Sequence, residues 1–290
     1  MYTKYWELQK KPFELGCDPA FFYAGETHLA VLLKLRYTIE NRRGSALFCG
    51  THGTGKSMIV SMLSRYGTNI CGLGPFINLG MPVFQTDDIL LYLADSMSRL
   101  NPEIKGNDPG FAEISEMPWG TLNSSGLYRA YSIIEQFLIE NSENQKHTVL
   151  CVDDFHQLND PNILTLFKSL MELQYRCRPI LSLILMTTSA SRLSPLSDQF
   201  VDYFIETKAE IPSLDFSETE KYIRHRLEIA EATREIFSPD SIPLIYEISN
   251  GIPRKINRIC DLALLIGYAE KMPQITEDVI ESLNRELVAS

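Results

Sequence analysis

Apolar residues along the chain follow two different spacings. Short continuous apolar runs alternate with longer stretches in which apolar residues recur every three or four positions. The first pattern is typical of buried strands and the second of amphipathic helices. The predicted strands are 45–49, 75–79, 148–152 and 180–186. The predicted helices are 27–41, one that begins near 58, 86–100, about 127–141 and 162–174. Because the strands are apolar on both faces and alternate with helices, the pattern predicts a parallel sheet with helices on either side.

The pattern changes at about residue 209, after which no strand signal remains and helix boundaries follow one another. Residues typical of helix starts and stops are Ser217 with Glu220, Ser238 with Pro239, Gly251, Pro253 and Thr276. Upstream, residues 101–126 are polar, are punctuated by Gly and Pro, and are longer than most connections in compact domains. We therefore predict an α/β domain over 1–208, with an irregular insertion at about 101–126, and a small helical domain over 209–290.

Composition and charge exclude several classes of protein. Hydrophobic residues make up 44% of the chain and charged residues 22%, which are values of a globular protein rather than of a disordered chain. The net charge of −10 repels polyanions on average, so a nucleic-acid role needs a local basic patch. The nearest cysteines, Cys49 and Cys71, are 22 residues apart, and the five histidines are scattered. We therefore expect reduced thiols and no metal held by protein side chains alone. No apolar run approaches roughly 18 residues, so we also expect a cytoplasmic chain without a membrane span.

A glycine-rich motif lies between a predicted strand and a predicted helix. Gly50, Gly55, Lys56 and Ser57 have the spacing of a P-loop, Gly-x4-Gly-Lys-Ser. In a P-loop the backbone N–H groups surround phosphate oxygens, the lysine reaches the β and γ phosphates, and the serine hydroxyl binds Mg²⁺. The predicted nucleotide-binding residues are Gly50, Thr51, His52, Gly53, Thr54, Gly55, Lys56, Ser57 and Met58. The flanking strand and helix favour ATP binding over a simple glycine turn.

Two adjacent carboxylates follow the predicted strand 148–152. Asp153 has the position of the residue that orients Mg²⁺ in P-loop proteins, and Asp154 that of the residue that activates water for attack on the γ phosphate. Their alternative roles are a helix N-cap and a solvated acid. Glutamate is more usual at the second position, and aspartate is shorter by one methylene, about 1.5 Å. A displacement of that size costs a factor of order 10² in a geometry-limited step, so we predict slow hydrolysis.

Two further positions are suited to the terminal phosphate. Thr187 and Thr188 end a predicted strand, where a hydroxyl can hydrogen-bond the attacking water, and Thr188 is the preferred candidate. Threonine is also common in strands for its shape alone. Arg254 lies in the first turn of a predicted helix, where its charge opposes the helix dipole, and we predict that it contacts phosphate. The predicted catalytic residues are Lys56, Asp154, Thr188 and Arg254, with Arg254 also a nucleotide ligand; Ser57 and Asp153 are the predicted Mg²⁺ ligands.

Several segments carry a family resemblance, namely 11–13, 18–23, 39–44, the P-loop, 152–154 and 251–261. Together they resemble the AAA+ ATPases of the ExeA type, general secretion pathway component A, over nearly the whole chain apart from about 101–126. The resemblance implies a five-stranded parallel α/β base with a helical lid, and ATP–Mg²⁺ at the base–lid junction of adjacent subunits in a homo-oligomer. It also implies that 12–23 lies near the adenine. Transposition ATPases of the MuB and TnsC kind look like relatives.

The chain departs from that family in three places. Asp154 stands where the family has glutamate, and residues 198–202 lack the arginine that the family places before the last strand, which leaves Arg192 as a substitute. The sequence also ends at Ser290 without a membrane span or a peptidoglycan-binding tail. Because an arginine finger contributes a factor of about 10³–10⁵ in rate, these departures favour weak turnover and argue against a secretion role in the strict sense.

The leading hypothesis is an ATP-binding, slowly hydrolysing AAA+ protein that assembles into oligomers and acts as a conformational switch. The first alternative is a DNA-associated assembly factor. Its candidate contacts are two basic groups, Lys34, Arg36, Arg42 and Arg43 together and Arg176 with Arg178, although such a group is more often a solvated helix face. The second alternative is a nucleotide-holding module with negligible turnover, in which Trp119 of the 101–126 insertion docks a protein partner.

Overall fold

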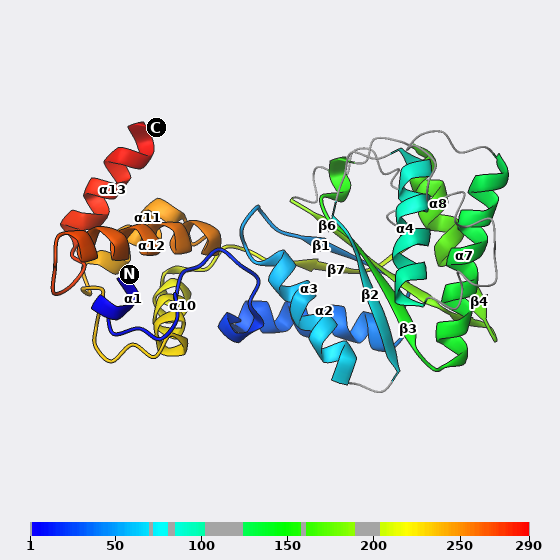
Figure 1. Cartoon of the computed structure of the whole chain (residues 1–290), viewed down its shortest axis with the longest axis horizontal. Helices are drawn as coiled ribbons and strands as arrows, with labels where there is room; N and C mark the ends of the chain where they lie inside the picture. The colour runs from blue at the N-terminus through cyan, green and yellow to red at the C-terminus, as the bar shows by residue number, and fades with distance from the viewer. Residues whose placement is uncertain are drawn as a thin grey trace. The chain divides into compact units, whose positions relative to one another are not determined.

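The computed structural model describes residues 2–69, 72–80, 85–101, 124–157, 161–188 and 204–289. The chain forms two compact units. The sheet unit comprises residues 32–49 and 63–210, and the helical unit comprises residues 1–31, 50–62 and 211–290. Figure 1 labels the helices and strands of both units. Most of the predicted insertion 101–126 lies outside the described residues, and the predicted domain boundary between 208 and 209 stays a prediction.

The sheet unit is built on one five-stranded sheet with the order β2-β3-β6-β1-β7. Its strands are β1 (Ser45–Cys49), β2 (Leu73–Leu79), β3 (His147–Val152), β6 (Leu181–Thr187) and β7 (Ile205–Glu210). Every neighbouring pair is parallel. The predicted parallel α/β sheet is therefore confirmed, and all the carboxyl ends of the strands lie at one edge of the sheet.

The apolar pattern located four of these strands and missed β7. In β7 the inward side chains of Ile205 and Ala209 alternate with the exposed Glu206, Lys208 and Glu210. A strand at the edge of a sheet that is buried on one face alternates in this way and carries no continuous apolar run. Strand β7 ends at Glu210, next to the predicted change of pattern at about residue 209.

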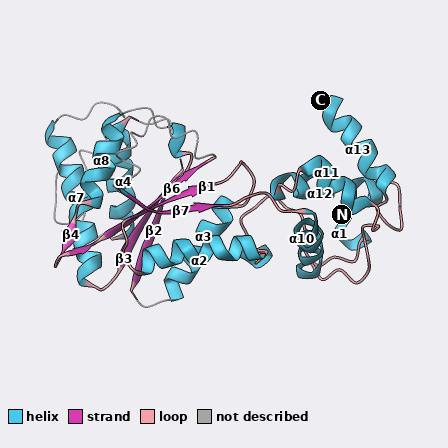
Figure 2. Cartoon of the chain, turned by 180° about the vertical axis from the view of Figure 1, so that it is seen from behind, coloured by secondary structure: helices cyan, strands magenta, loops and turns pink. Residues whose placement is uncertain are grey.

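Helices cover both faces of the sheet. Figures 1 and 2 show α4, α7 and α8 on one side of the strands and α2 and α3 on the other. The bounds are α2 (Glu26–Glu40), α3 (Lys56–Asn69), α4 (Thr86–Leu100), α7 (Ser124–Glu143) and α8 (Pro161–Met171). The predicted helix 162–174 ends early, at Met171, because the chain there enters a short hairpin of β4 (Gln174–Tyr175) and β5 (Arg178–Pro179).

The core of the sheet unit explains why its strands are apolar throughout. Strands β1, β3 and β6 are buried at every position. Ile89 of α4, Phe137 of α7 and Phe167 of α8 are buried in the same core. Burying a side chain of this size stabilises the fold by about 1.5–3 kcal/mol. The central strands are therefore held between two helical layers, which makes their ends a rigid support for functional groups.

The helical unit contains α10 (Phe216–Ile229), α11 (Ser241–Ser249), α12 (Pro253–Ala269) and α13 (Glu277–Ala289). The short N-terminal elements α1 (Tyr2–Tyr5) and η1 (Pro19–Phe21) belong to this unit as well. Trp6 is fully buried, and its indole Nε1 donates to the carbonyl of Leu264 at 2.9 Å. The Phe13 ring packs edge-on against Phe237, with 6.0 Å between the ring centroids. The N-terminal segment is thus part of the core of the helical unit; its position relative to an adenine stays a prediction.

Helix starts in the helical unit differ from the predicted ones in detail. The capping box of α10 pairs Asp215 with Glu218, two residues before the predicted Ser217 and Glu220. Both pairs have the spacing of a capping box, and the charged Asp215 interacts more favourably than serine with the positive end of the helix dipole. Helix α11 starts at Ser241 instead of beside Pro239, whereas Pro253 occupies the first turn of α12 as predicted. Within the described ranges, no helix combines the length and apolar character that crossing a bilayer requires.

The stability of the sheet unit should depend on pH through His147. This residue is 1% exposed, its Nε2 lies 2.8 Å from the Ser182 hydroxyl, and burial, aided by the charge of Arg42, lowers its pKa from 6.5 to about 4. The unfolded chain therefore binds more protons than the folded chain between these values. The stabilising contribution is complete above pH 6.5 and disappears as the pH falls through 4, a change of about 3 kcal/mol.

Urea unfolding of the wild type and of His147→Gln between pH 7.5 and pH 4 measures this contribution. The variant should lose less unfolding free energy than the wild type over that range, because glutamine does not titrate. His52→Gln serves as the control, since His52 is exposed. Parallel pH profiles for the wild type and His147→Gln would contradict the assignment.

Candidate nucleotide-binding site

The Gly-x4-Gly-Lys-Ser segment connects a strand to a helix. Strand β1 ends at Cys49, and α3 begins at Lys56 and runs for 14 residues. The first intrahelical hydrogen bond of α3 runs from the Ile59 N–H to the Gly55 carbonyl at 3.0 Å. The N–H groups of the first turn of a helix have no partner inside the helix, and together with the helix dipole they favour an anion. The sequence thus forms the strand, loop and helix that a phosphate-binding loop requires.

The lysine of the motif is folded into the loop. Lys56 is 7% exposed, and its Nζ donates to the carbonyl oxygens of Gly50 at 2.6 Å and of Thr51 at 3.3 Å. The Thr54 hydroxyl donates to the same Thr51 carbonyl at 2.9 Å. These contacts hold the ammonium group beside the backbone that surrounds it, while Ser57 at the start of α3 is exposed. The loop therefore carries a fixed positive charge at the amino end of a helix.

The start of α12 lies against this loop, within the helical unit. The Arg254 N–H donates to the Gly53 carbonyl at 3.1 Å. Gly53 has a φ of 87°, in the left-handed region, and a Cβ at this position would lie 2.7 Å from the Arg254 Cβ. Glycine is therefore required both by the turn and by the approach of α12. The structure brings Arg254 to the loop, and the Arg254 side chain is exposed.

The two carboxylates of the sheet unit follow β3 directly. The Asp153 N–H donates to the Leu79 carbonyl at 2.9 Å, which extends the pairing of β3 with β2 by one residue. The Asp153 carboxylate accepts a hydrogen bond from the Asp154 N–H at 2.9 Å. Asp154 has a φ of 45°, a conformation that aspartate tolerates better than most residues with longer side chains. This backbone conformation gives a physical reason for aspartate rather than glutamate at 154.

A hydroxyl without a hydrogen-bond partner follows β6, the neighbour of β3. Thr188 is 8% exposed, and among the described residues its Oγ1 is buried and unpaired. Thr187, the last residue of β6, pairs in register with Cys49 of β1, and Val152 of β3 pairs with Leu185. Because these strands are parallel, Asp153 and Thr188 lie at the same edge of the sheet. The buried Thr188 hydroxyl fits a polar ligand at that edge.

Comparisons with known proteins identify relatives of the chain. It is 26% identical over 272 residues to general secretion pathway protein A of Aeromonas hydrophila, a match that covers 93% of this chain and 45% of that protein. The chain therefore spans less than half the length of this relative. A comparison with protein-family models finds no match.

Solved structures show the same fold. Aeropyrum pernix ORC1 protein in complex with DNA superposes with a TM-score of 0.66 at 14% identity, over 92% of this chain and 67% of that one. Cdc6p from Pyrobaculum aerophilum superposes with a TM-score of 0.66 at 15% identity, over 89% of this chain and 68% of that one. The chain has an AAA+ fold. The predicted resemblance to AAA+ proteins of the general secretion pathway protein A type is confirmed.

Sequence reasoning missed one residue beside the AAA+ P-loop. His28 of α2 is 7% exposed, and its Nε2 lies 3.2 Å from the Thr54 carbonyl oxygen. Burial lowers the pKa of His28, so the ring is neutral near pH 7 and its Nε2–H donates to that carbonyl. His28 shares the apolar stripe of α2 with Leu32, Leu35 and Ile39, a spacing that predicts burial. Only the tertiary structure shows that the histidine supports the loop.

The site residues that sequence analysis proposed are not all described. Arg192 and the segment 198–202 lie outside the described residues. Among the residues that are described, no cluster of three or more His, Cys, Asp or Glu side chains is arranged to hold a metal ion.

The turn before Arg254 should be sensitive to any side chain at Gly251. Gly251 has a φ of 65°, its carbonyl accepts the Leu214 N–H at 2.9 Å, and a Cβ would lie 1.9 Å from the Leu214 carbonyl oxygen. Gly251→Ala must therefore displace backbone and adopt a strained φ, and we expect a loss of about 3 kcal/mol or more in unfolding free energy. Chemical denaturation measures it.

Gly16→Ala is the matched control, because a Cβ at Gly16 meets no atom within 4 Å and its backbone is outside the left-handed region. We expect this control to change the unfolding free energy by less than about 1 kcal/mol. Equal effects of the two substitutions would show that the contact between Gly251 and Leu214 does not constrain the turn.

Proposed function

We propose that the chain binds ATP with Mg²⁺ at the P-loop, hydrolyses it slowly, and acts as a nucleotide-dependent switch in a homo-oligomer. The family relationship supports a P-loop ATPase in general. The single observation that carries the proposal is the loop 50–57, where the buried Lys56 ammonium lies against loop carbonyls at the amino end of α3. Such an arrangement favours the binding of phosphate oxygens.

The residues present fit a triphosphate with Mg²⁺. Lys56 would exchange its carbonyl contacts for the β and γ phosphate oxygens, which are stronger acceptors because they are charged. The exposed hydroxyl of Ser57 and the carboxylate of Asp153 would hold the metal ion. When bound, Mg²⁺ neutralises part of the phosphate charge and thereby stabilises the transition state. Asp153 is suited to this role because two backbone contacts, those of its N–H and of its carboxylate, fix its position.

Asp154 and Thr188 would act on the attacking water. In the proposal, the Asp154 carboxylate accepts the proton of that water, and the Thr188 hydroxyl donates or accepts the hydrogen bond that positions it. The unpaired Thr188 Oγ1 supports this assignment, since a buried hydroxyl without a partner costs about 1–3 kcal/mol unless a ligand satisfies it. The short side chain of Asp154 keeps its carboxylate about 1.5 Å from the usual position of glutamate, and turnover is slow for that reason.

Arg254 would couple binding of the γ phosphate to the position of α12 in the helical unit. Its N–H is bonded to the Gly53 carbonyl, so any shift of the loop on nucleotide binding acts directly on the first turn of α12. Its guanidinium is exposed, and in the proposal it contacts a phosphate bound at the loop. This coupling is the switch that we propose. A cytoplasmic location and a protein partner remain part of the proposal and rest on the sequence alone.

Removing the P-loop lysine tests nucleotide binding. Lys56→Ala should weaken ATP binding by about 10²-fold, because charge-assisted hydrogen bonds to two phosphates are lost. Equilibrium binding of a fluorescent ATP analogue with Mg²⁺ measures the dissociation constant. Lys221→Ala, which removes an exposed lysine from α10, is the control and should bind as the wild type does. Undiminished binding by Lys56→Ala would refute the site.

Lengthening the side chain at 154 tests the cause of slow turnover. Asp154→Glu should raise the steady-state rate of phosphate release by up to about 10²-fold at similar ATP affinity, because the carboxylate then reaches the usual position. The positive φ of Asp154 costs the longer side chain some stability, so the unfolding temperature is measured alongside. Asp154→Asn should bind ATP but release less phosphate than the wild type. No gain in Asp154→Glu, with the fold intact, would mean that another group limits the rate.

A further inference from the structure

Basic residues that are far apart in the sequence converge at the edge of the sheet opposite to the carboxyl ends of its strands. We call them the amino-edge cluster: Arg42, Arg43, Lys146, Arg176 and Arg178. The first two residues precede β1, Lys146 precedes β3, and the last two lie in the hairpin before β6. Four of these five side chains are exposed, and Arg42 is half-buried.

Strand register places these residues together. Strands β1 and β3 flank β6, and the Leu183 N–H of β6 donates to the Gly44 carbonyl at 3.1 Å. On the other side, Thr148 pairs with Leu181. Neighbouring strands lie about 4.8 Å apart, so the amino ends of the three strands span about 10 Å. Arg42 also experiences the charge of Arg178. The pKa of Arg42 is lowered mainly by burial and, to a smaller extent, by this neighbouring charge.

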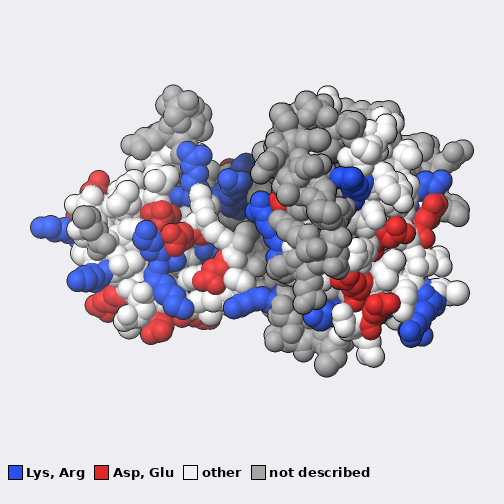
Figure 3. Space-filling model, turned by 45° about the vertical axis from the view of Figure 1, so that its right-hand side comes forward, with Lys and Arg blue, Asp and Glu red and all other residues white. Residues whose placement is uncertain are grey.

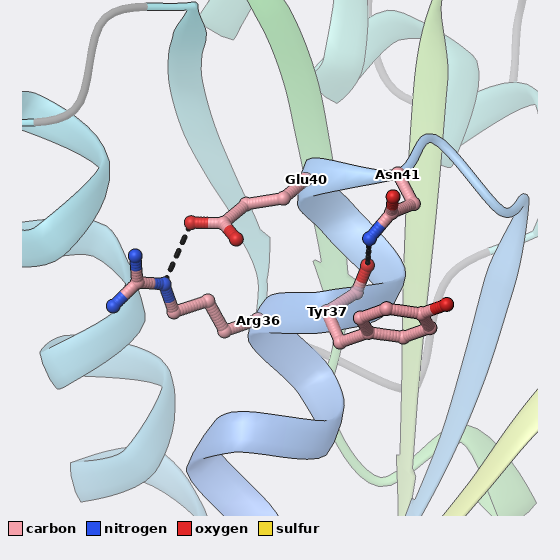
Figure 4. A network of polar contacts seen from close by, with 4 residues as sticks. All are labelled: Arg36, Tyr37, Glu40 and Asn41. Carbon is pink, nitrogen blue, oxygen red and sulfur yellow. Dashed lines mark hydrogen bonds and ion pairs between the residues drawn. The ribbon is translucent and has the colours of Figure 1, made fainter.

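Within the described part of the chain, no member of the cluster forms an ion pair. Other arginines do so with a carboxylate one helical turn away: Arg36 with Glu40, Arg99 with Asp95, Arg224 with Glu220 and Arg285 with Glu281. Figure 4 shows that Glu40 is engaged by Arg36. On the face drawn in Figure 3, Lys and Arg side chains are interspersed with Asp and Glu. Within four residues of a cluster member along the chain, the exposed acids are Glu40, Glu143 and Glu172, and Glu40 is paired with Arg36.

Two guanidinium groups of the cluster are held in place by tyrosines. The Arg43 guanidinium carbon lies 5.1 Å from the Tyr37 ring centroid, and that of Arg176 lies 5.0 Å from the Tyr175 centroid. Stacking restricts the guanidinium groups before any partner arrives, which lowers the entropy lost on binding. Positioned guanidinium groups of this kind suit a charged partner such as a phosphate backbone.

We propose that the amino-edge cluster binds the phosphate backbone of duplex DNA without reading its sequence. Arginine presents two parallel N–H donors that match phosphate oxygens, and four of the five residues are arginines. The inference goes beyond the proposed ATPase, since the cluster is built from the amino ends of the strands and binding needs no nucleotide hydrolysis.

Fluorescence anisotropy with a labelled 30-base-pair duplex of arbitrary sequence tests this proposal on the full chain, at salt concentrations from 20 to 200 mM and without nucleotide. Contacts to about three to five phosphates should make log Kobs fall linearly with log[salt] with a slope of about −3 to −4.5. The double variant Arg176→Glu with Arg178→Glu should weaken binding at least 10-fold and make the slope less negative by about 2.

The matched control carries Arg99→Glu with Arg224→Glu, which changes the net charge by the same amount at two exposed, ion-paired positions. It should bind at nearly wild-type strength, and thermal unfolding verifies that both double variants are folded. The proposal is overturned by any of three results: no wild-type binding at 20 mM salt, equal weakening in test and control variants, or unchanged binding in the test variant. If the test variant instead loses only self-association, the cluster is a protein contact and the DNA proposal fails.

Discussion

Parallel pairing of β1, β6 and β3 is the constraint on which the arrangement of functional groups depends. Parallel strands send all their carboxyl ends to one edge and all their amino ends to the other. At the carboxyl edge, Asp153 and Thr188 follow neighbouring strands, and the chain continues from β1 directly into the P-loop. At the amino edge, the same pairing gathers arginines from the turn between α2 and β1 and from the hairpin before β6. Because all three strands are buried along their whole length, a slip by one residue would exchange the side chains that pack against the two helical layers.

The helical unit uses its N-terminal segment as part of its core. Trp6 donates to a carbonyl of α12, and the buried Arg226 of α10 donates through Nε to the Pro12 carbonyl and through another guanidinium nitrogen to that of Glu14. The same unit contains the P-loop, supported from one side by His28 and from the other by the first turn of α12. A displacement of the loop would therefore be transmitted to a packed body rather than to a free helix. This is the physical basis of the proposed switch.

Local backbone conformation bears on chemistry at two positions. Asp154 has a positive φ, which a short polar side chain tolerates, and the shortness of that side chain is the reason for the proposed slow turnover. Gly251 also has a positive φ and leaves no room for a Cβ beside Leu214, and it precedes Arg254 by three residues. In both cases the residue type is set by the turn as much as by the reaction.

The sequence by itself determined the elements whose signal is local: the buried strands, the P-loop between a strand and a helix, and the start of α12 at Pro253. It also located Asp153 at the end of β3, because a carboxylate that directly follows an apolar run can be recognised in the sequence alone. Strand β7 was not predicted, because its alternating pattern reflects burial on a single face. That burial depends on where the strand lies in the sheet. Similarly, two overlapping capping boxes have the same spacing, and only the packed helix selects Asp215.

Only the tertiary structure decided which distant residues meet. The contact of His28 with the Thr54 carbonyl, that of the Arg254 N–H with Gly53, and the convergence of Arg42 with Arg178 join positions from 26 to 201 residues apart. Periodicity records whether a side chain is buried, because burial repeats with the turn of a helix or the pleat of a strand. It carries no record of the partner, because the partner is set by the order and direction in which whole elements pack.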